Sequence, residues 1–289
     1  MNDKTWALAL SAVLLCSAGV VPEVNARIPA AVIAQAEMSM LLTGKVDVDA
    51  QGRVTGLTVD EQAAYSAGVL DHVRRTAMAW QFEQIMRDGD PVAFTSPVSM
   101  RLIARQAGEG SFEIRMDSAS FGDGDKNDPA SVRSVRMTPP RYPEAAFRAG
   151  ITGTVYLAVN VGRDGKVRDV AAEQVDLTSA GNERVMAQAR EVLARASLQA
   201  ARGWTFRAPE QGDAVAADSW NLRIPVTFQL SDQQRATPRP GQWQPYIPGP
   251  RQRVPFLNKE DGPLNSSLRE GGIYMAGRPG PRLKTPLEG

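Results

Sequence analysis

The residue types that carry out most enzyme chemistry are scarce in this chain. Its 289 residues include one cysteine, Cys16, and one histidine, His72. One cysteine and one histidine are too few for a Cys/His metal site, and a single cysteine cannot form an intrachain disulfide. His72 stands next to Asp71 in a helix pattern, and neither a G-x-S-x-G motif nor a glycine-rich loop that opens a helix accompanies it. We interpret His72 as a solvated helix residue, and the sequence predicts no enzyme, no cofactor and no metal site.

A proline points to binding instead. Pro225 lies within the strand pattern SWNLRIPVTFQL, residues 219–230. Because proline has no N–H to donate to a ladder, a strand that contains it lies at a sheet edge with the proline nitrogen outward. An edge strand can take up another chain through its unpaired backbone groups. Blocking of aggregation at the same edge is the alternative role. The residues that an added strand would contact are Asn221, Leu222, Arg223, Pro225, Thr227 and Gln229.

The elements before this strand predict one small α+β domain over residues 132–230. Pro143 suits the first position of a short helix, and Gly150 ends that helix. Residues 163–165 (RDG) have the composition of a hairpin turn. We expect the strand before the turn to bury one face through alternating residues, which are Val155, Leu157, Val159 and Val161.

A longer helix follows the hairpin and leads to the last strand. Asn182 has the type of an N-cap residue, and Gly203 stands just past the end of the helical pattern. The predicted apolar stripe of this helix comprises Val185, Ala189, Val192, Leu193, Ala196 and Ala200. In the last strand the alternating residues are Leu222, Ile224, Val226 and Phe228.

Four motifs of this domain resemble the C-terminal domain of the TonB family, and they occur in the same order. They are P-x-Y-P-x-x-A (Pro140, Tyr142, Pro143, Ala146), V-x-V-x-x-D-G-x-V (Val159, Val161, Asp164, Gly165, Val167), G-W-x-F (Gly203, Trp204, Phe206) and P-V-x-F (Pro225, Val226, Phe228). The resemblance implies a three-stranded antiparallel sheet packed by two helices. It also implies that the domain takes up the TonB-box strand of outer-membrane receptors and couples it to an inner-membrane motor. By resemblance Tyr142 and Pro143 form a wall of the partner-strand site; packing of the tyrosine on the sheet at the start of a helix is the alternative.

Residues 27–106 predict a degenerate copy of the same domain. The spacing from Gly52 to Trp80 is 28 positions, against 39 from Gly165 to Trp204. The first copy is therefore expected to have a shorter connection or helix, over residues 60–79, and both tryptophans are expected to be core anchors. The inward residues there would be Val69, Leu70, Val73, Ala77 and Trp80. The matched positions of the two copies are Pro29 and Pro143, Gly52 and Gly165, Trp80 and Trp204, and Phe82 and Phe206.

Residues 1–26 have the pattern of a signal peptide. An uncharged apolar run over residues 6–21 follows Lys4, and Val24-Asn25-Ala26 is an acceptable cleavage site. The run is shorter than the roughly 20 residues that cross a bilayer as a helix. We expect export to the periplasm and a mature chain from Arg27. A single retained anchor in the inner membrane is the alternative.

Residues 107–131 and 231–289 lack the composition of packed domains. The first stretch is dominated by Gly, Ser, Asp and Asn and predicts a linker. The second has 10 Pro and 8 Gly in 59 residues and predicts a disordered tail. Nine Lys/Arg against five Asp/Glu give the tail a charge of +4, so docking to an anionic envelope component is its second interpretation. The charge of the whole chain, +1, gives no attraction to nucleic acid.

The sequence thus favours a non-enzymatic periplasmic protein with tandem TonB-like domains. The second domain would take up an extended peptide of an outer-membrane receptor or another envelope protein. The alternative is an energy transducer anchored in the inner membrane. Against it stand the short apolar run, the lack in that run of the histidine that the family's transducers carry, and the lack of a long Pro-rich spacer before the C-terminal domain.

Overall fold

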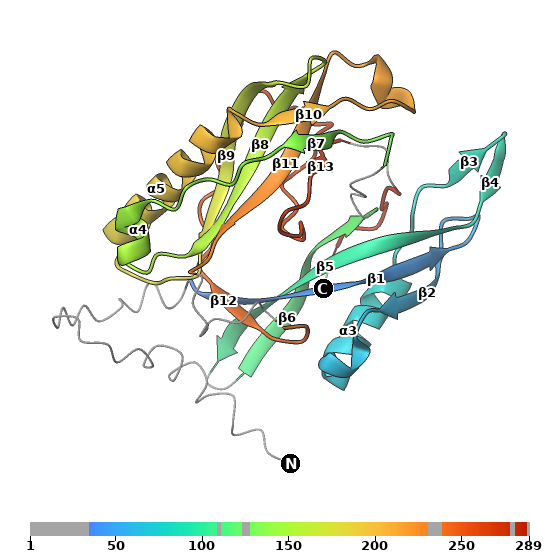
Figure 1. Ribbon diagram of the computed structural model, residues 1–289. Coiled ribbons are helices and arrows are strands. Elements are labelled where there is room, and N and C mark those ends of the chain that lie inside the picture. The colour runs from blue at the N-terminus through green and yellow to red at the C-terminus, as the bar shows by residue number, and fades with distance from the viewer. Residues whose placement is uncertain (1–34, 109–110, 123–127, 231–238, 278–280, 288–289) are drawn as a thin grey trace.

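The computed structural model describes residues 35–108, 111–122, 128–230, 239–277 and 281–287, which form an α+β structure of antiparallel sheets and few helices (Figure 1). The expected signal peptide, residues 1–26, and the Pro29 motif lie outside the described residues. Two larger sheets each carry one long helix, and the end of the chain runs between them (Figure 1). None of the helices in these ranges has the length and apolar character that crossing a membrane requires.

The N-terminal sheet has the strand order β12-β1-β5-β6, and β2 also pairs with β1. The Ser66 side chain accepts a hydrogen bond from the Val69 N–H and so caps α3, which buries Val69, Val73 and Ala77 as predicted. The elements of this part are β1 (Glu37–Val48), β2 (Val54–Val59), a 3-10 turn (Gln62–Ala64), α3 (Ala67–Met78), β3 (Ile85–Arg87), β4 (Asp90–Val92), β5 (Phe94–Gly108), β6 (Ser111–Phe121) and β12 (Gln244–Tyr246).

The C-terminal sheet has the strand order β13-β11-β8-β9. Its local signals hold: Gly165 adopts a φ of +75° in the β8–β9 turn, and the Asn182 side chain caps α5 by accepting from the Val185 N–H. The elements of this part are β7 (Arg133–Arg136), α4 (Glu144–Arg148), β8 (Gly153–Gly162), β9 (Val167–Leu177), α5 (Glu183–Ala201), β10 (Thr205–Arg207), a 3-10 turn (Asp213–Ala216), β11 (Ser219–Phe228) and β13 (Tyr274–Met275).

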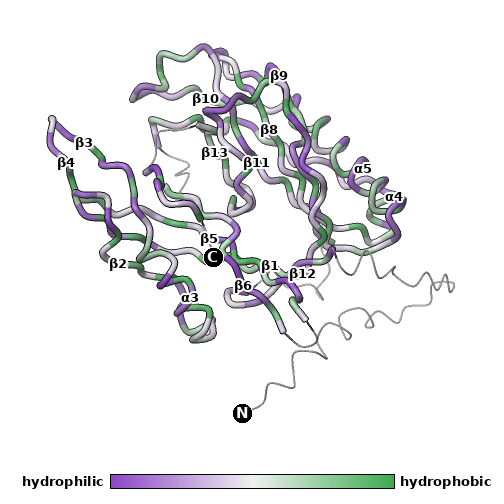
Figure 2. Tube along the Cα trace, turned by 180° about the vertical axis from the view of Figure 1, so that it is seen from behind, coloured by the Kyte–Doolittle hydropathy of each residue, from purple (hydrophilic) through white to green (hydrophobic). Residues whose placement is uncertain are grey.

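Each sheet has its own core. Trp80 and Trp204 are both buried, one in each core, as expected of core anchors. The alternating residues of β8 and β11 that were predicted to face the core are also buried there. In Figure 2, hydrophobic and hydrophilic segments alternate along α5 and the strands, as they do in elements with one apolar face.

Two details at the helices differ from the sequence predictions. Pro143 is the N-cap of α4 and not its first residue. The stripe of α5 is rotated by about one position, so that Val185 is 47% exposed. The helix lies against β8 and β9, and three of the five residues that it buries have small side chains. The residues that α5 buries are Met186, Ala189, Leu193, Ser197 and Ala201.

The predicted linker, residues 107–131, is wrong in its first half. β5 continues to Gly108, and β6 pairs with it along its length. Phe112, Ile114 and Met116 alternate in β6, and Met116 enters the N-terminal core. The polar composition of the stretch therefore concealed a strand with one apolar face. Residues 123–127 are not among the described residues.

The prediction of a disordered tail is wrong for residues 239–277 and 281–287. The Ile247 N–H donates to the Leu177 oxygen at 2.7 Å, and the Gln252 N–H donates to the Glu173 oxygen at 2.7 Å. The tail has little regular structure of its own, but strand edges elsewhere in the chain satisfy its backbone groups. Its orange-to-red course passes between the two sheets (Figure 1). The buried apolar residues of the tail are Tyr246, Ile247, Val254, Leu264 and Leu268.

The two sheets share an order of elements: a hairpin, a helix, an aromatic segment and a long strand that pairs with the first strand of the hairpin. The Phe82 N–H donates to the Gly52 oxygen at 2.7 Å, and the Phe206 N–H donates to the Gly165 oxygen at 2.8 Å. One difference bears on function. The outer edge of β5 is paired with the long strand β6, whereas the outer edge of β11 is paired only with the two-residue strand β13.

Candidate functional site

The outward-facing backbone groups of β11 can be assigned from one hydrogen bond. β8 pairs with β11 along its whole length. On the opposite side, the Ala276 N–H donates to the Asn221 oxygen at 2.8 Å, so the backbone of Asn221 faces away from β8. Backbone groups alternate along an antiparallel strand. Arg223, Pro225 and Thr227 therefore also face outward, and Pro225 lies at an outer edge as the sequence predicted.

That edge is open over only part of its length, which corrects the prediction of a free edge along residues 219–230. β13 pairs with Leu222 and Arg223, opposite Met275 and Tyr274. The pairing stops before Pro225, which has no N–H with which to continue the ladder. In the described part of the chain no strand pairs with β11 beyond this point on that side.

Beside the open part of the edge lies a groove of about 410 Å³. One wall is β11 from Ile224 to Phe228, followed by Gln229. A second wall comes from residues 131–142, which include part of β7, and tail residues 270, 271 and 273 form a third. An extended segment in this groove would meet the outward oxygen of Pro225 and both backbone groups of Thr227. Within the described residues, neither the pairing of β13 with β11 nor the other backbone hydrogen bonds include the Thr227 N–H on this side.

Tyr142 and Pro143, the pair suggested by resemblance, separate in the structure. Tyr142 lines the groove, and its ring meets Phe147 and Phe228 edge to face at 5.6 and 5.3 Å. Its hydroxyl donates to the Ile151 oxygen. Tyr142 therefore packs on α4 and on the sheet and also forms part of a groove wall, so its two interpretations are compatible. Pro143 caps α4 and is not among the lining residues.

The groove is mainly apolar, with one basic side chain, Arg133, and one acidic side chain, Glu270. Trp204 and Ile224 contribute apolar surface. The Arg133 guanidinium is paired with the Glu210 carboxylate at 2.8 Å. Burial raises the pKa of the Glu270 carboxyl above its usual range, and a hydrogen bond from Thr227 partly offsets that shift. An apolar groove beside an open strand edge can hold an extended peptide by backbone pairing and side-chain burial.

The side chains of the other predicted contact residues in β11 make contacts within the protein itself. Leu222 is fully buried in the C-terminal core. The Asn221 amide donates to the Asp261 carboxylate at 2.9 Å. The structure thus brings Pro225, Thr227, Gln229 and Tyr142 together around the groove, and it places Asn221 and Leu222 elsewhere.

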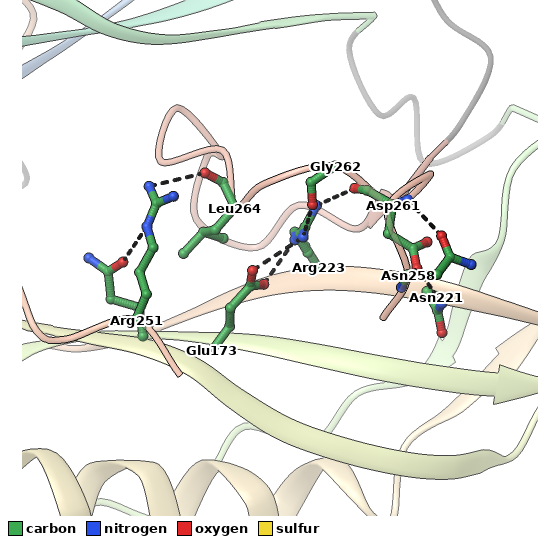
Figure 3. A network of polar contacts seen from close by, with 9 residues as sticks. Glu173, Asn221, Arg223, Arg251, Asn258, Asp261, Gly262 and Leu264 are labelled. Carbon is green, nitrogen blue, oxygen red and sulfur yellow. Dashed lines mark hydrogen bonds and ion pairs between the residues drawn. The ribbon is translucent and has the colours of Figure 1, made fainter. Parts of the chain in front are cut away.

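Arg223 lies in a polar network behind the edge (Figure 3). Its Nε donates to the Glu173 carboxylate at 2.9 Å, and both side chains are largely buried. Its Nη1 and Nη2 donate to the backbone oxygens of Asp261 and Gly262, both at 2.8 Å. A buried charge requires this degree of pairing, because an unpaired one is costly to bury.

Sequence reasoning missed the tail's contribution to the groove. Glu270, Gly271 and Ile273 line it, although they belong to a segment predicted to be disordered. A local signal was present, since Ile273, Tyr274 and Met275 form a short strand-like run between glycines. A metal site is not indicated: within the described ranges, His, Cys, Asp and Glu side chains form no group of three or more that could hold an ion.

Comparison with known proteins finds similarity in the C-terminal domain. Residues 138–230 match the family described as Gram-negative bacterial TonB protein C-terminal. Two proteins named Protein TonB, from Xanthomonas campestris pv. campestris strains B100 and ATCC 33913, are 39% identical over 100 residues, which are 35% of this chain and 39% of each relative. Protein tonB2 of Pseudomonas aeruginosa is 33% identical over 92 residues, 32% of this chain and 29% of the relative.

A solved structure, described as the solution NMR structure of Pseudomonas aeruginosa TonB CTD, has 19% sequence identity and a TM-score of 0.24, and the match covers 38% of this chain and 94% of that chain. The present chain matches less than half the length of the curated relatives. Residues 138–230 are thus similar to the TonB C-terminal family, and the similarity covers about a third of this chain.

Proposed function

We propose that residues 138–230 bind an extended peptide segment of an outer-membrane receptor, or of another envelope protein, by strand addition to the outer edge of β11. The observation that carries this proposal is the groove of about 410 Å³ beside the unpaired outer edge at Pro225 and Thr227. Similarity of this domain to the TonB C-terminal family supports the choice of partner.

Two kinds of interaction would share the binding energy. A hydrogen bond between backbones contributes about 0.5–1.5 kcal/mol net, and only a few outward groups are free at this part of the edge. Burial of one large apolar side chain contributes roughly 1.5–3 kcal/mol. The apolar walls formed by Tyr142, Trp204 and Ile224 would therefore supply much of the affinity, whereas the backbone pairing would set direction and register.

Thr227 offers the sharpest test of strand addition. Thr227→Pro removes the outward N–H, whereas Thr227→Val keeps that N–H and removes only the hydroxyl. We expect Thr227→Pro to weaken binding of a TonB-box peptide about tenfold, the equivalent of one backbone hydrogen bond at the upper end of its range. We expect the affinity of the Thr227→Val variant for the same peptide to stay within about threefold of that of the unmodified protein. Calorimetry measures both affinities.

The fold of each variant is checked by thermal melting. Because β11 pairs with β8 through its other backbone groups, Thr227→Pro should keep the cooperative transition. Equal affinities of a folded Thr227→Pro variant and its valine control would rule out strand addition at this edge.

We further propose that residues 27–106 are a divergent copy of the same domain and that only the later copy binds peptide. The shared order of elements and the equivalent bonds at Gly52 and Gly165 support a duplication. In the first copy β6 covers the edge of β5 that corresponds to the outer edge of β11. A closed edge leaves that copy the role of a scaffold.

The compartment that fits this function is the periplasm, reached through a cleaved signal peptide. The alternative is an energy transducer held in the inner membrane by residues 6–21. N-terminal sequencing of the protein from the cell envelope separates the two: we expect a start near Arg27, and an intact Met1 would support the anchored transducer.

A further inference from the structure

The proposed binding edge is partly covered by residues 258–277 of the same chain, which we name the latch segment. We propose that the latch segment is an intramolecular competitor: it occupies the outer edge of β11 at Asn221 and Arg223, and a partner strand must displace it to pair along the full edge. This inference rests on the proposed function, since it concerns the regulation of the same site.

The latch segment makes the bonds that a partner strand would make. β13 runs antiparallel to β11, with Met275 opposite Leu222 and Tyr274 opposite Arg223. The Ala276 N–H donates to the Asn221 oxygen at 2.8 Å. The outward groups at Asn221 and Arg223 are therefore not open to another strand while β13 is in place. Displacement of β13 would roughly double the number of outward backbone groups that β11 can offer.

Side chains and carbonyls hold the segment behind the strand (Figure 3). The Asp261 carboxylate accepts from the Asn221 amide at 2.9 Å and from the Asn258 N–H at 2.8 Å. The Arg223 guanidinium donates to the backbone oxygens of Asp261 and Gly262. These contacts connect β11 directly to the latch segment, so binding of a partner strand to β11 and retention of the latch are coupled.

The network also allows the segment to leave. When Asp261 and Gly262 withdraw, Arg223 retains its ion pair with the Glu173 carboxylate on β9. Opening therefore leaves no buried charge without a partner, which is the expensive outcome when a buried pair is broken. Water can replace the two carbonyl acceptors at the newly exposed edge.

The segment makes apolar contacts with a small cluster and with the C-terminal core, against which Ile273 and Met275 pack from half-buried positions. Leu264 and Leu268 pack with Tyr156, and Tyr274 packs against the same cluster from a half-buried position. The preceding part of the tail is anchored separately: β12 pairs with β1, and Ile247 pairs with Leu177 of β9. Detachment of the latch segment would break the hydrogen bonds that Asn265 and Ser266 donate to β6, whereas Tyr246 and Ile247 would keep the preceding part of the tail in place.

The expected effect of such a competitor is a lower apparent affinity. The measured dissociation constant rises in inverse proportion to the fraction of molecules whose edge is open. A latch that is closed in nine molecules of ten would weaken partner binding about tenfold. Variants that open or lock the segment should move the affinity in opposite directions.

The full-length chain provides both kinds of variant. Ala276→Pro removes the N–H that donates to Asn221, and Ala276→Ser is the matched control that keeps it. For the locked form, Asn221→Cys and Ala276→Cys are combined with Cys16→Ser. Hydrogen-bonded residues of an antiparallel pair have Cα atoms about 5.5 Å apart, within the range of about 4.4–6.8 Å that a disulfide requires.

Two fluorescent peptides serve as probes. One carries the sequence of residues 270–277, EGGIYMAG, which fits this edge in the protein itself. The other is a TonB-box peptide of an outer-membrane receptor. We expect Ala276→Pro to bind both about tenfold more tightly than Ala276→Ser. We expect the oxidised cysteine pair to bind both about tenfold more weakly than the same protein after reduction.

The outcomes separate the two proposals. Equal affinity of the oxidised and reduced forms for a TonB-box peptide that does bind overturns the latch and leaves the proposed function standing. Binding of the 270–277 peptide by the reduced form, with no binding of the TonB-box peptide, supports the latch and overturns the choice of partner. If neither peptide binds to the reduced form, both proposals fail. The oxidised and reduced comparison applies even where Ala276→Pro does not fold.

Discussion

Gly52 and Gly165 place the same demand on the backbone in the two sheets. Their φ angles are +82° and +75°, in the left-handed region that favours glycine. A Cβ on Gly52 would lie 2.3 Å from the Phe82 oxygen, and one on Gly165 would lie 2.1 Å from the Phe206 oxygen. At both positions the glycine thus lets the hairpin turn approach the backbone of the aromatic segment that follows the helix.

Substitution of either glycine should therefore damage the fold to a similar degree. We expect Gly52→Ala and Gly165→Ala each to lower the free energy of unfolding by about 1–3 kcal/mol, because both introduce backbone strain and a steric clash. Gly68→Ala is the control: Gly68 lies in α3 with open space around its Cα, so alanine should be neutral or stabilise by about 0.5–1 kcal/mol. Urea denaturation measures all three.

The comparison of the two glycines bears on the duplication. Similar losses of unfolding free energy on substitution of Gly52 and Gly165 would support a common origin and a common role of the two turns. A loss at Gly165 alone would mean that the turn at Gly52 tolerates a side chain, and the proposal of a second copy would then rest only on the order of the elements.

At the scale of elements, the sequence predicted those whose signals are local. The cap of α5 at Asn182, the turn at Gly165 and the alternation in β8 each depend on a few neighbouring residues, and all three were found. The rotation of the α5 stripe was not predictable, because it depends on how the helix lies on β8 and β9. The helical period predicts how wide the apolar stripe is. It does not predict which residue lies at the centre of the stripe when alanines occur on both sides of it.

The missed strands, β6 and β13, show two different limits. β6 carried an alternating signal at Phe112, Ile114 and Met116, and the polar composition around it outweighed that signal. β13 has two residues, and its pairing with Leu222 and Arg223 depends on a register between distant segments. Local propensity cannot supply such a register, because the edge of β11 selects it.

Part of the candidate site was likewise predictable from the sequence, and part of it was not. The outward orientation of the Pro225 nitrogen followed from the lack of an N–H in proline, so the location of the edge was predictable. Gln229 and Tyr142 border the groove. Glu270 and Ile273 reach the groove only because the tail folds back, and the half of the edge at Asn221 and Arg223 is closed for the same reason.

At the scale of the whole molecule, the tail joins the two sheets at adjacent residues. Tyr246 pairs with Glu37 of β1, and its hydroxyl donates to the Glu37 carboxylate. Burial raises the pKa of that hydroxyl, which keeps it protonated as the donor. The next residue, Ile247, exchanges two backbone hydrogen bonds with Leu177 of β9. A Pro/Gly-rich segment is thus ordered here by preformed edges on both sides, which its composition alone does not reveal.

Ile247 tests whether this junction stabilises the molecule. Its side chain is buried in the C-terminal core, so Ile247→Ala should cost about 2–5 kcal/mol of unfolding free energy. For a protein of this size that loss corresponds to a fall in Tm of roughly 4–20 °C. Arg253→Ala, at an exposed position of the same tail, should change the free energy of unfolding by no more than about 0.5 kcal/mol. Calorimetric melting of the two variants gives both values. Equal Tm values of Ile247→Ala and Arg253→Ala would mean that the tail contributes little to the stability of the fold. A lower Tm for Ile247→Ala would mean that the tail is a structural part of the fold, as its buried residues and its pairing with both sheets predict.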